Sequence, residues 1–61
     1  MKRFIIINLD GSRVAGTPSY SDHLDAFLAL SYLRDADKLT VLDVTDEENP
    51  KFWSDGRWIR L

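Results

Sequence analysis

Short apolar stretches alternate with turn-forming residues along this chain, and the first stretch is typical of a β-strand. Its three consecutive isoleucines are too few for a helix and belong to the residues that favour β structure. Asp10 and Gly11 follow, the residue pair best suited to a two-residue type I′ turn. We therefore expect a strand over residues 3–9, buried on both faces, and a return strand over residues 12–16. The turn would pair Leu9 with Ser12, Asn8 with Arg13 and Ile7 with Val14.

Residues 23–34 contain neither glycine nor proline and predict a helix in the middle of the chain. Residues 17–21 are crowded with helix-start types, and either Thr17 or Ser19 is suited to cap the first turn. We expect the helix to begin within this segment, to continue to Arg34 and to fray over residues 35–37. It is the one helix that the pattern predicts.

The apolar side of this helix is wider than contact with one sheet requires. At about 100° per residue, the broad apolar side carries Tyr20, Leu24, Phe27, Leu28, Leu30 and Ser31, while Asp22, Asp25, Ala29 and Ala36 mark the solvent side. Apolar surface is therefore expected to remain after folding. Leu28 and Tyr32 are the candidate residues of a homodimer interface.

The last third of the chain predicts a strand and a second hairpin. Residues 39–45 have strand character, and the polar segment 46–50 ends in proline and predicts a loop. Two strands joined by Asp55 and Gly56 would place Trp53 opposite Trp58. The fold class is thus α+β: one helix packed on a small, mostly antiparallel sheet in the order ββαβββ. The order becomes ββαββ or ββαβ if residues 51–54 form a loop or a single helical turn.

Length and composition limit the chain to one small domain, residues 1–61. With 44% hydrophobic residues it is globular, but a chain this short buries only about 60% of its unfolded surface. It has no cysteine and no apolar run long enough to span a membrane, so we expect a soluble, cytoplasmic protein with no disulfide and no thiolate metal site. The net charge of −2 also differs from the strongly basic character of most nucleic-acid-binding proteins.

Candidate catalytic and metal-binding residues are few. His23 is the single histidine, it follows Asp22 directly, and neighbouring residues of a helix point in different directions. No nucleophile, phosphate-binding or EF-hand pattern is present. We therefore predict no enzyme activity, no cofactor and no metal. The acidic residues Asp46, Glu47 and Glu48 form a solvated loop or a docking surface for a basic partner.

The C-terminal hairpin combines aromatic and basic side chains, and it is the strongest candidate binding site. The candidate residues are Phe52, Trp53, Trp58, Arg57 and Arg60. Tryptophan and arginine dominate the energetics of protein interfaces, while aromatic rings interleaved with cations also bind single-stranded nucleic acid. A third interpretation is that the tryptophans close the small core.

These observations favour a non-catalytic protein-interaction module. The hypothesis is a small inhibitor or regulator that docks on a larger macromolecular machine through the helix and the tryptophan-rich hairpin, as a homodimer. The alternative is a single-stranded nucleic-acid-binding module that uses the same hairpin. The sequence does not identify the partner.

Overall fold

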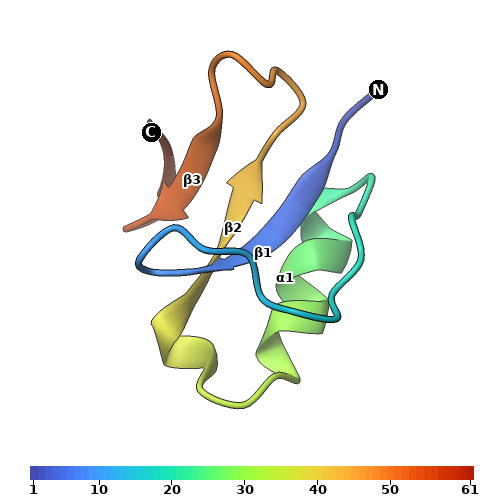
Figure 1. Cartoon of the computed structure of the whole chain (residues 1–61), viewed down its shortest axis with the longest axis vertical. Helices are drawn as coiled ribbons and strands as arrows, with labels where there is room; N and C mark the ends of the chain where they lie inside the picture. Colours follow the sequence, from blue (N-terminus) through green and yellow to red (C-terminus); the bar gives the residue numbers. More distant parts are fainter.

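The computed structural model describes residues 1–61 and contains one α-helix on a four-stranded antiparallel sheet. The elements in chain order are β1 (Phe4–Asn8), α1 (His23–Ser31), the 3₁₀ turn η1 (Ala36–Lys38), β2 (Leu39–Asp43), β3 (Lys51–Ser54) and β4 (Arg57–Arg60). The spatial order of the strands is β1-β2-β3-β4 (Figure 1). The expected α+β class is confirmed, and residues 51–54 form a strand and not a loop.

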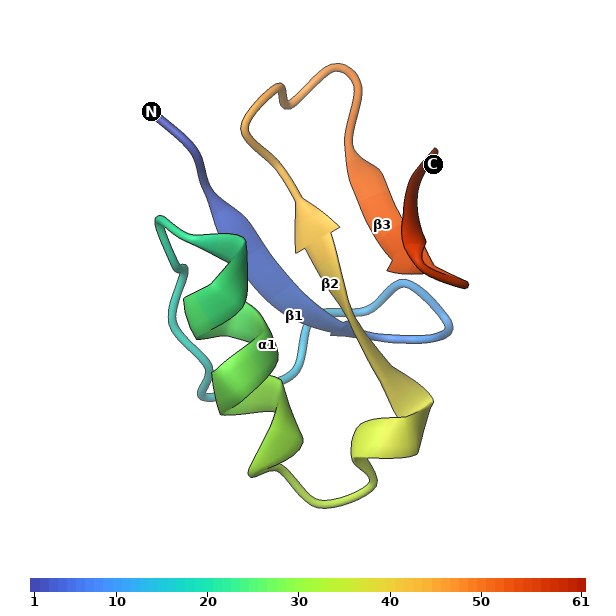
Figure 2. The same cartoon turned by 180° about the vertical axis from the view of Figure 1, so that it is seen from behind.

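The helix packs on one face of the sheet, over β1 and β2 (Figure 2). Ala26 is fully buried there, in a cluster with Phe4 and Val41. A small side chain at this position lets the helix backbone approach the sheet closely. Because side chains alternate along a strand, Ile5 points to the other face, where it forms a second cluster with Ile7 and Leu42.

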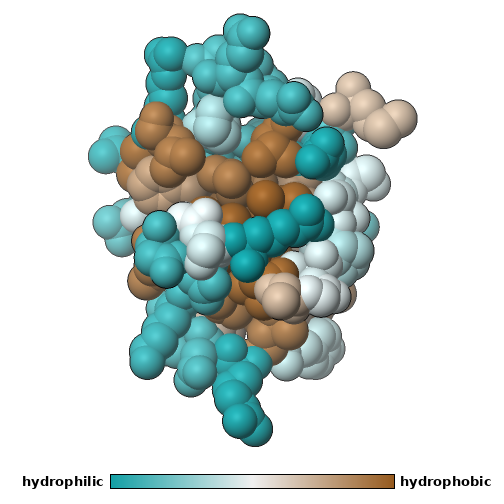
Figure 3. Space-filling model, in the orientation of Figure 1, coloured by the Kyte–Doolittle hydropathy of each residue, from teal (hydrophilic) through white to brown (hydrophobic).

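The face of the sheet opposite α1 has no second helix. The apolar cluster on this side is flanked by the half-buried side chains of Val44 and Phe52. Figure 3 shows apolar side chains gathered in the middle of the molecule in this view, with hydrophilic ones above and below. The molecule therefore has one layer of sheet and a partial layer of helix.

The turn after β1 differs from the expected type I′ turn. The amide of Gly11 donates to the carbonyl of Asn8 at 2.9 Å, and the amide of Asn8 donates to the carbonyl of Ser12 at 2.7 Å. Gly11 has a φ of +97°, while Asp10 is not among the residues with positive φ. This is a three-residue loop that ends in a left-handed glycine. The Asp10 carboxylate accepts from both the amide and the hydroxyl of Ser12, which favours this local turn.

The return strand expected over residues 12–16 does not form. One added loop residue moves the register, so that Ile7 lies opposite Arg13 and not opposite Val14. This contact is an isolated bridge, because the chain turns again at Gly16, which has a φ of +81°. The observed element order is therefore βαβββ, with the helix between the first two strands.

The helix begins later than expected. Its N-cap is Asp22, whose carboxylate accepts a hydrogen bond of 2.9 Å from the amide of Leu24. The expected start within residues 17–21 is wrong, because Tyr20 is held in an extended conformation beside β1. Phe4 and Tyr20 exchange two backbone hydrogen bonds of 2.8 Å.

The sheet-facing side of α1 coincides only in part with the broad apolar side read from the sequence. Ala26 is buried and Phe27, Ala29 and Leu30 are half-buried. The expectation that Ala29 and Ala36 mark the solvent side is wrong, since both are half-buried. The helix is also shorter than expected, ending at Ser31 with Tyr32 as its C-cap.

Candidate interaction surfaces

Two large apolar side chains of α1 and the side chain of its C-cap residue are exposed in a line along the helix. Leu24, Leu28 and Tyr32 are 65%, 59% and 81% exposed, respectively. Their spacing of four residues places them on one side of the helix. We call these three residues the helix stripe. It includes Leu28 and Tyr32, both candidate dimer residues from the sequence.

The tryptophans of the C-terminal hairpin lie on the same face of the sheet as α1. Their ring centroids are 5.3 Å apart, and the Phe27 ring lies 5.4 Å from Trp53. Trp58 also packs against Phe4 at 5.8 Å. Both indoles are half-buried. The interpretation that they close the core is therefore correct in part, while part of each ring remains at the surface beside the helix.

Phe52 lies apart from the tryptophans. Its register partners are Leu42 and Ile59, which places its side chain on the face opposite α1. There it packs against the cluster around Ile5 and Ile7. The candidate hairpin residues predicted from the sequence therefore divide between two faces of the sheet.

The two arginines of β4 also point to opposite faces, because they are three residues apart in a strand. Both are exposed. Nη2 of Arg60 donates a hydrogen bond of 2.6 Å to Oδ1 of Asn49, which is neutral. Neither guanidinium forms an ion pair within the chain. Both charges are therefore available to a partner.

Two of the three acidic loop residues are engaged within the chain. Glu47 forms an ion pair with Arg3, with 3.8 Å between Oε1 and Nη1. The Asp46 carboxylate accepts from the side chain of Asn49 and from the amide of Glu48, and these hydrogen bonds lower the pKa of Asp46 below its ordinary value of 3.8. The loop carries negative charge, but hydrogen bonds within the loop hold Asp46 and the ion pair engages Glu47.

His23 is exposed and stands close to Asp22, with 3.7 Å between Nδ1 and Oδ1. The expectation that these two residues do not face each other is wrong, because Asp22 is the N-cap and has an extended, non-helical backbone with a φ of −132°. The imidazole packs edge-on against Phe4 at 5.9 Å and Phe27 at 6.2 Å. His23 therefore lies at the margin of the hydrophobic core.

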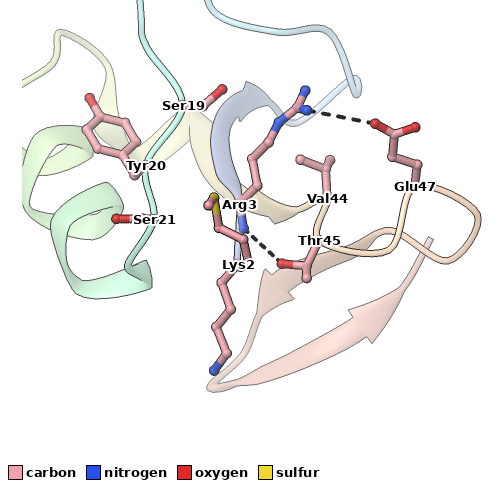
Figure 4. A pocket seen from close by; sticks show the side chains of 9 residues that line it. Lys2, Arg3, Ser19, Tyr20, Ser21, Val44, Thr45 and Glu47 are labelled. Atoms are coloured by element: carbon pink, nitrogen blue, oxygen red, sulfur yellow. Dashed lines mark hydrogen bonds and ion pairs between the residues drawn. The ribbon is translucent and has the colours of Figure 1, made fainter.

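The largest hollow is an open groove of about 460 Å³ between the N-terminal residues, the segment before α1 and the loop after β2 (Figure 4). Among its lining residues, the amide of Arg3 donates a hydrogen bond of 2.9 Å to Oγ1 of Thr45, and Arg3 forms the ion pair with Glu47. His23 is not among its lining residues. No pattern in the sequence indicated this groove, because three separate segments form it.

No group of three or more His, Cys, Asp and Glu side chains is placed to hold a metal ion. None of the helices is both long enough and apolar enough to cross a membrane. No protein family, curated protein or solved structure matches the chain. Its function has to be inferred from its surfaces.

Proposed function

We propose that this chain is a non-catalytic, cytoplasmic protein-interaction module, a small inhibitor or regulator that docks on a larger macromolecular machine. The helix stripe and the C-terminal hairpin are its two contact surfaces. The observation that carries the proposal is the helix stripe, because three large apolar side chains in one line are costly to leave in water.

The occupant of the helix stripe is a second copy of this chain. If two α1 helices pack antiparallel with Leu28 on the two-fold axis, Leu24 of one copy lies opposite Tyr32 of the other. One self-complementary patch therefore serves both subunits.

The dimer is expected to be reversible. Three side chains are far fewer than the roughly 20 to 30 residues that each side of a stable interface contributes. We expect a dissociation constant between about 1 μM and about 1 mM, which corresponds to roughly 4 to 8 kcal/mol. Such a dimer can dissociate when the module docks on its larger partner.

Sedimentation velocity across this concentration range tests the proposal. The wild-type chain should sediment faster as its concentration rises, and Leu28→Glu should remain monomeric, because it places two carboxylates together on the axis. Leu9→Glu is the matched control, since Leu9 is also exposed but lies outside the stripe. A wild-type chain that stays monomeric throughout, or a Leu28→Glu variant that still dimerises, would contradict it.

The hairpin supports docking on a partner protein. Trp53 and Trp58 keep part of their rings at the surface, and Arg60 carries a free charge on the same face of the sheet. Residues of these two types supply most of the binding energy in protein interfaces. Single-stranded nucleic acid would need free ring faces on which bases stack, whereas these rings pack against each other and against Phe27. The geometry therefore favours a protein partner.

A further inference from the structure

The two outer edges of the sheet differ in whether other backbone segments pair with them. The outer edge of β1 is covered by the chain that follows it: Phe4 and Tyr20 exchange two hydrogen bonds, and the amide of Val14 donates to the carbonyl of Ile6 at 3.1 Å. An additional strand cannot pair along this edge without displacing these contacts. The β1 edge is closed.

The outer edge of β4 is open. β4 stands at the end of the sheet and pairs with β3 alone. The two-residue turn makes Ser54 and Arg57 a hydrogen-bonded pair, so the alternation of antiparallel pairing turns the amides and carbonyls of Trp58 and Arg60 outward. Such unpaired groups are a template for a further strand.

The side chains along this edge follow a cation–apolar–apolar–cation order. Trp58 and Arg60 lie on the α1 side of the sheet, and Arg57 and Ile59 lie on the other side. The Arg60 guanidinium donates a hydrogen bond to the neutral Asn49 side chain, and neither Arg60 nor Arg57 forms an ion pair. An added strand therefore meets one unpaired positive charge on each face.

A second copy of this chain does not suit the β4 edge. β4 carries two arginines and no carboxylate, so a second β4 strand would add two positive charges to this edge and neutralise none. Charges of the same sign repel each other. The two arginines thus oppose edge-to-edge self-association, while they attract a strand of opposite charge.

We propose that the β4 edge binds an extended acidic peptide segment of a partner protein as an added fifth strand. The segment has the order acidic, apolar, apolar, acidic: its carboxylates pair with Arg57 and Arg60, and its central residues lie beside Trp58 and Ile59. The order is palindromic, so either strand direction satisfies it. This inference rests on the proposed function and names the chemistry of the partner.

An end-capped peptide, Gly-Gly-Glu-Val-Val-Glu-Gly-Gly, is the probe that tests this inference. Its binding to the ¹⁵N-labelled chain should slow hydrogen exchange at the amides of Trp58 and Arg60, which face the added strand. The double variant Arg57→Glu and Arg60→Glu should bind the peptide at least about tenfold more weakly, because two attractive contacts become repulsive. The same variant should bind the peptide in which lysine replaces both glutamates.

Lys2→Glu with Arg13→Glu is the matched control, since it changes the net charge equally and lies outside the hairpin. It should leave binding of the acidic peptide within about twofold. Equal binding by both double variants would overturn the inference. So would undiminished binding of a peptide with N-methyl groups on its two valines and two glutamates, or tighter binding of oligothymidylate than of the acidic peptide at this edge.

Failure here is distinguishable from failure of the proposed function. If no acidic peptide binds at β4 while Leu28→Glu still abolishes a wild-type dimer, the edge inference is wrong and the interaction module stands. If the chain never dimerises but the peptide binds with the expected charge dependence, the helix stripe is not a dimer surface and the edge inference stands.

Discussion

Trp53 and Trp58 face each other across the C-terminal hairpin, with ring centroids 5.3 Å apart and ring planes inclined by 72°. Edge-to-face pairs of this kind contribute about 0.5 to 1 kcal/mol beyond the area they bury. Each single change to alanine should lower the free energy of unfolding by roughly 2 kcal/mol, less than for a fully buried tryptophan.

A double-mutant cycle measured by urea unfolding isolates the interaction between the two rings. Trp53→Ala, Trp58→Ala and the double variant should give a coupling of about 0.5 to 1 kcal/mol. Strictly additive effects would show that the rings contribute only through separate contacts, such as those with Phe27.

The turn of this hairpin depends on left-handed backbone at two consecutive residues. Asp55 has a φ of 51° and Gly56 a φ of 80°, as a type I′ turn requires. A Cβ at Gly56 would meet no atom within 4 Å, so Gly56→Ala tests backbone conformation alone. It should cost about 1 to 2 kcal/mol in chemical denaturation, whereas Asp55→Asn should change stability by less than about 0.5 kcal/mol. Equal effects would contradict this.

The two aspartate–glycine pairs show what could and could not be predicted from the sequence. The same dipeptide predicted a type I′ turn twice, correctly at Asp55 and wrongly at Asp10. The difference lies in the following residue: Ser12 supplies an amide and a hydroxyl that bind the Asp10 carboxylate, while Arg57 continues a strand. Local side-chain hydrogen bonds thus compete with the turn that the dipeptide favours.

Asp46 gives the loop before β3 a dependence on pH. The hydrogen bond from the Asn49 side chain, with a second from the Glu48 amide, holds the pKa of Asp46 below 3.8. Because the folded pKa is the lower one, this contribution to stability is present above the ordinary value and is lost as pH falls through the folded pKa. The difference in unfolding free energy between wild type and Asp46→Asn should therefore shrink on acidification below about pH 4.

NMR titration of the Asp46 carboxyl carbon tests whether the Asn49 side chain lowers the pKa of Asp46. Removal of the main donor in Asn49→Ala should raise the pKa of Asp46 toward its ordinary value. Asn49 also accepts from Arg60, so Arg60→Ala serves as the comparison: it removes the bond to Asn49 and leaves both donors to Asp46 in place. An unchanged pKa in Asn49→Ala would contradict the assignment.

The start of α1 depends on one carboxylate. The Asp22 side chain accepts from the amide of Leu24 at 2.9 Å, so Asp22→Ala should cost about 1 kcal/mol of stability. Asp25→Ala is the control, because Asp25 is exposed in the first turn without capping it, and its loss should cost less than about 0.5 kcal/mol. Thermal unfolding of both variants makes the comparison. A larger effect at Asp25 would place the cap elsewhere.

Some features of the candidate surfaces could be predicted from the sequence, and others could not. The aromatic pairing in the hairpin followed from turn length and strand alternation, which are local properties. The helix orientation did not, because the apolar arc covers more than half of the helix and periodicity alone does not show which part meets the sheet. In the folded chain Ala26 contacts the sheet, whereas Leu24 and Leu28 remain exposed. The open β4 edge was not predicted either, since strand order is a property of the whole fold.

Opposite changes at Ala26 and Leu28 test this orientation. Ala26 is sealed between α1 and the sheet, so Ala26→Leu adds three carbons where there is no space and should destabilise the chain by about 1 to 3 kcal/mol. Leu28 is exposed, so Leu28→Ala should change the stability of the monomer by less than about 0.5 kcal/mol. Urea unfolding at a protein concentration well below about 1 μM keeps dimer formation out of the measurement. If the side of α1 that carries Leu24 and Leu28 packed against the sheet instead, Leu28→Ala would lower the stability by about 2 to 5 kcal/mol. Ala26→Leu would then change the stability little.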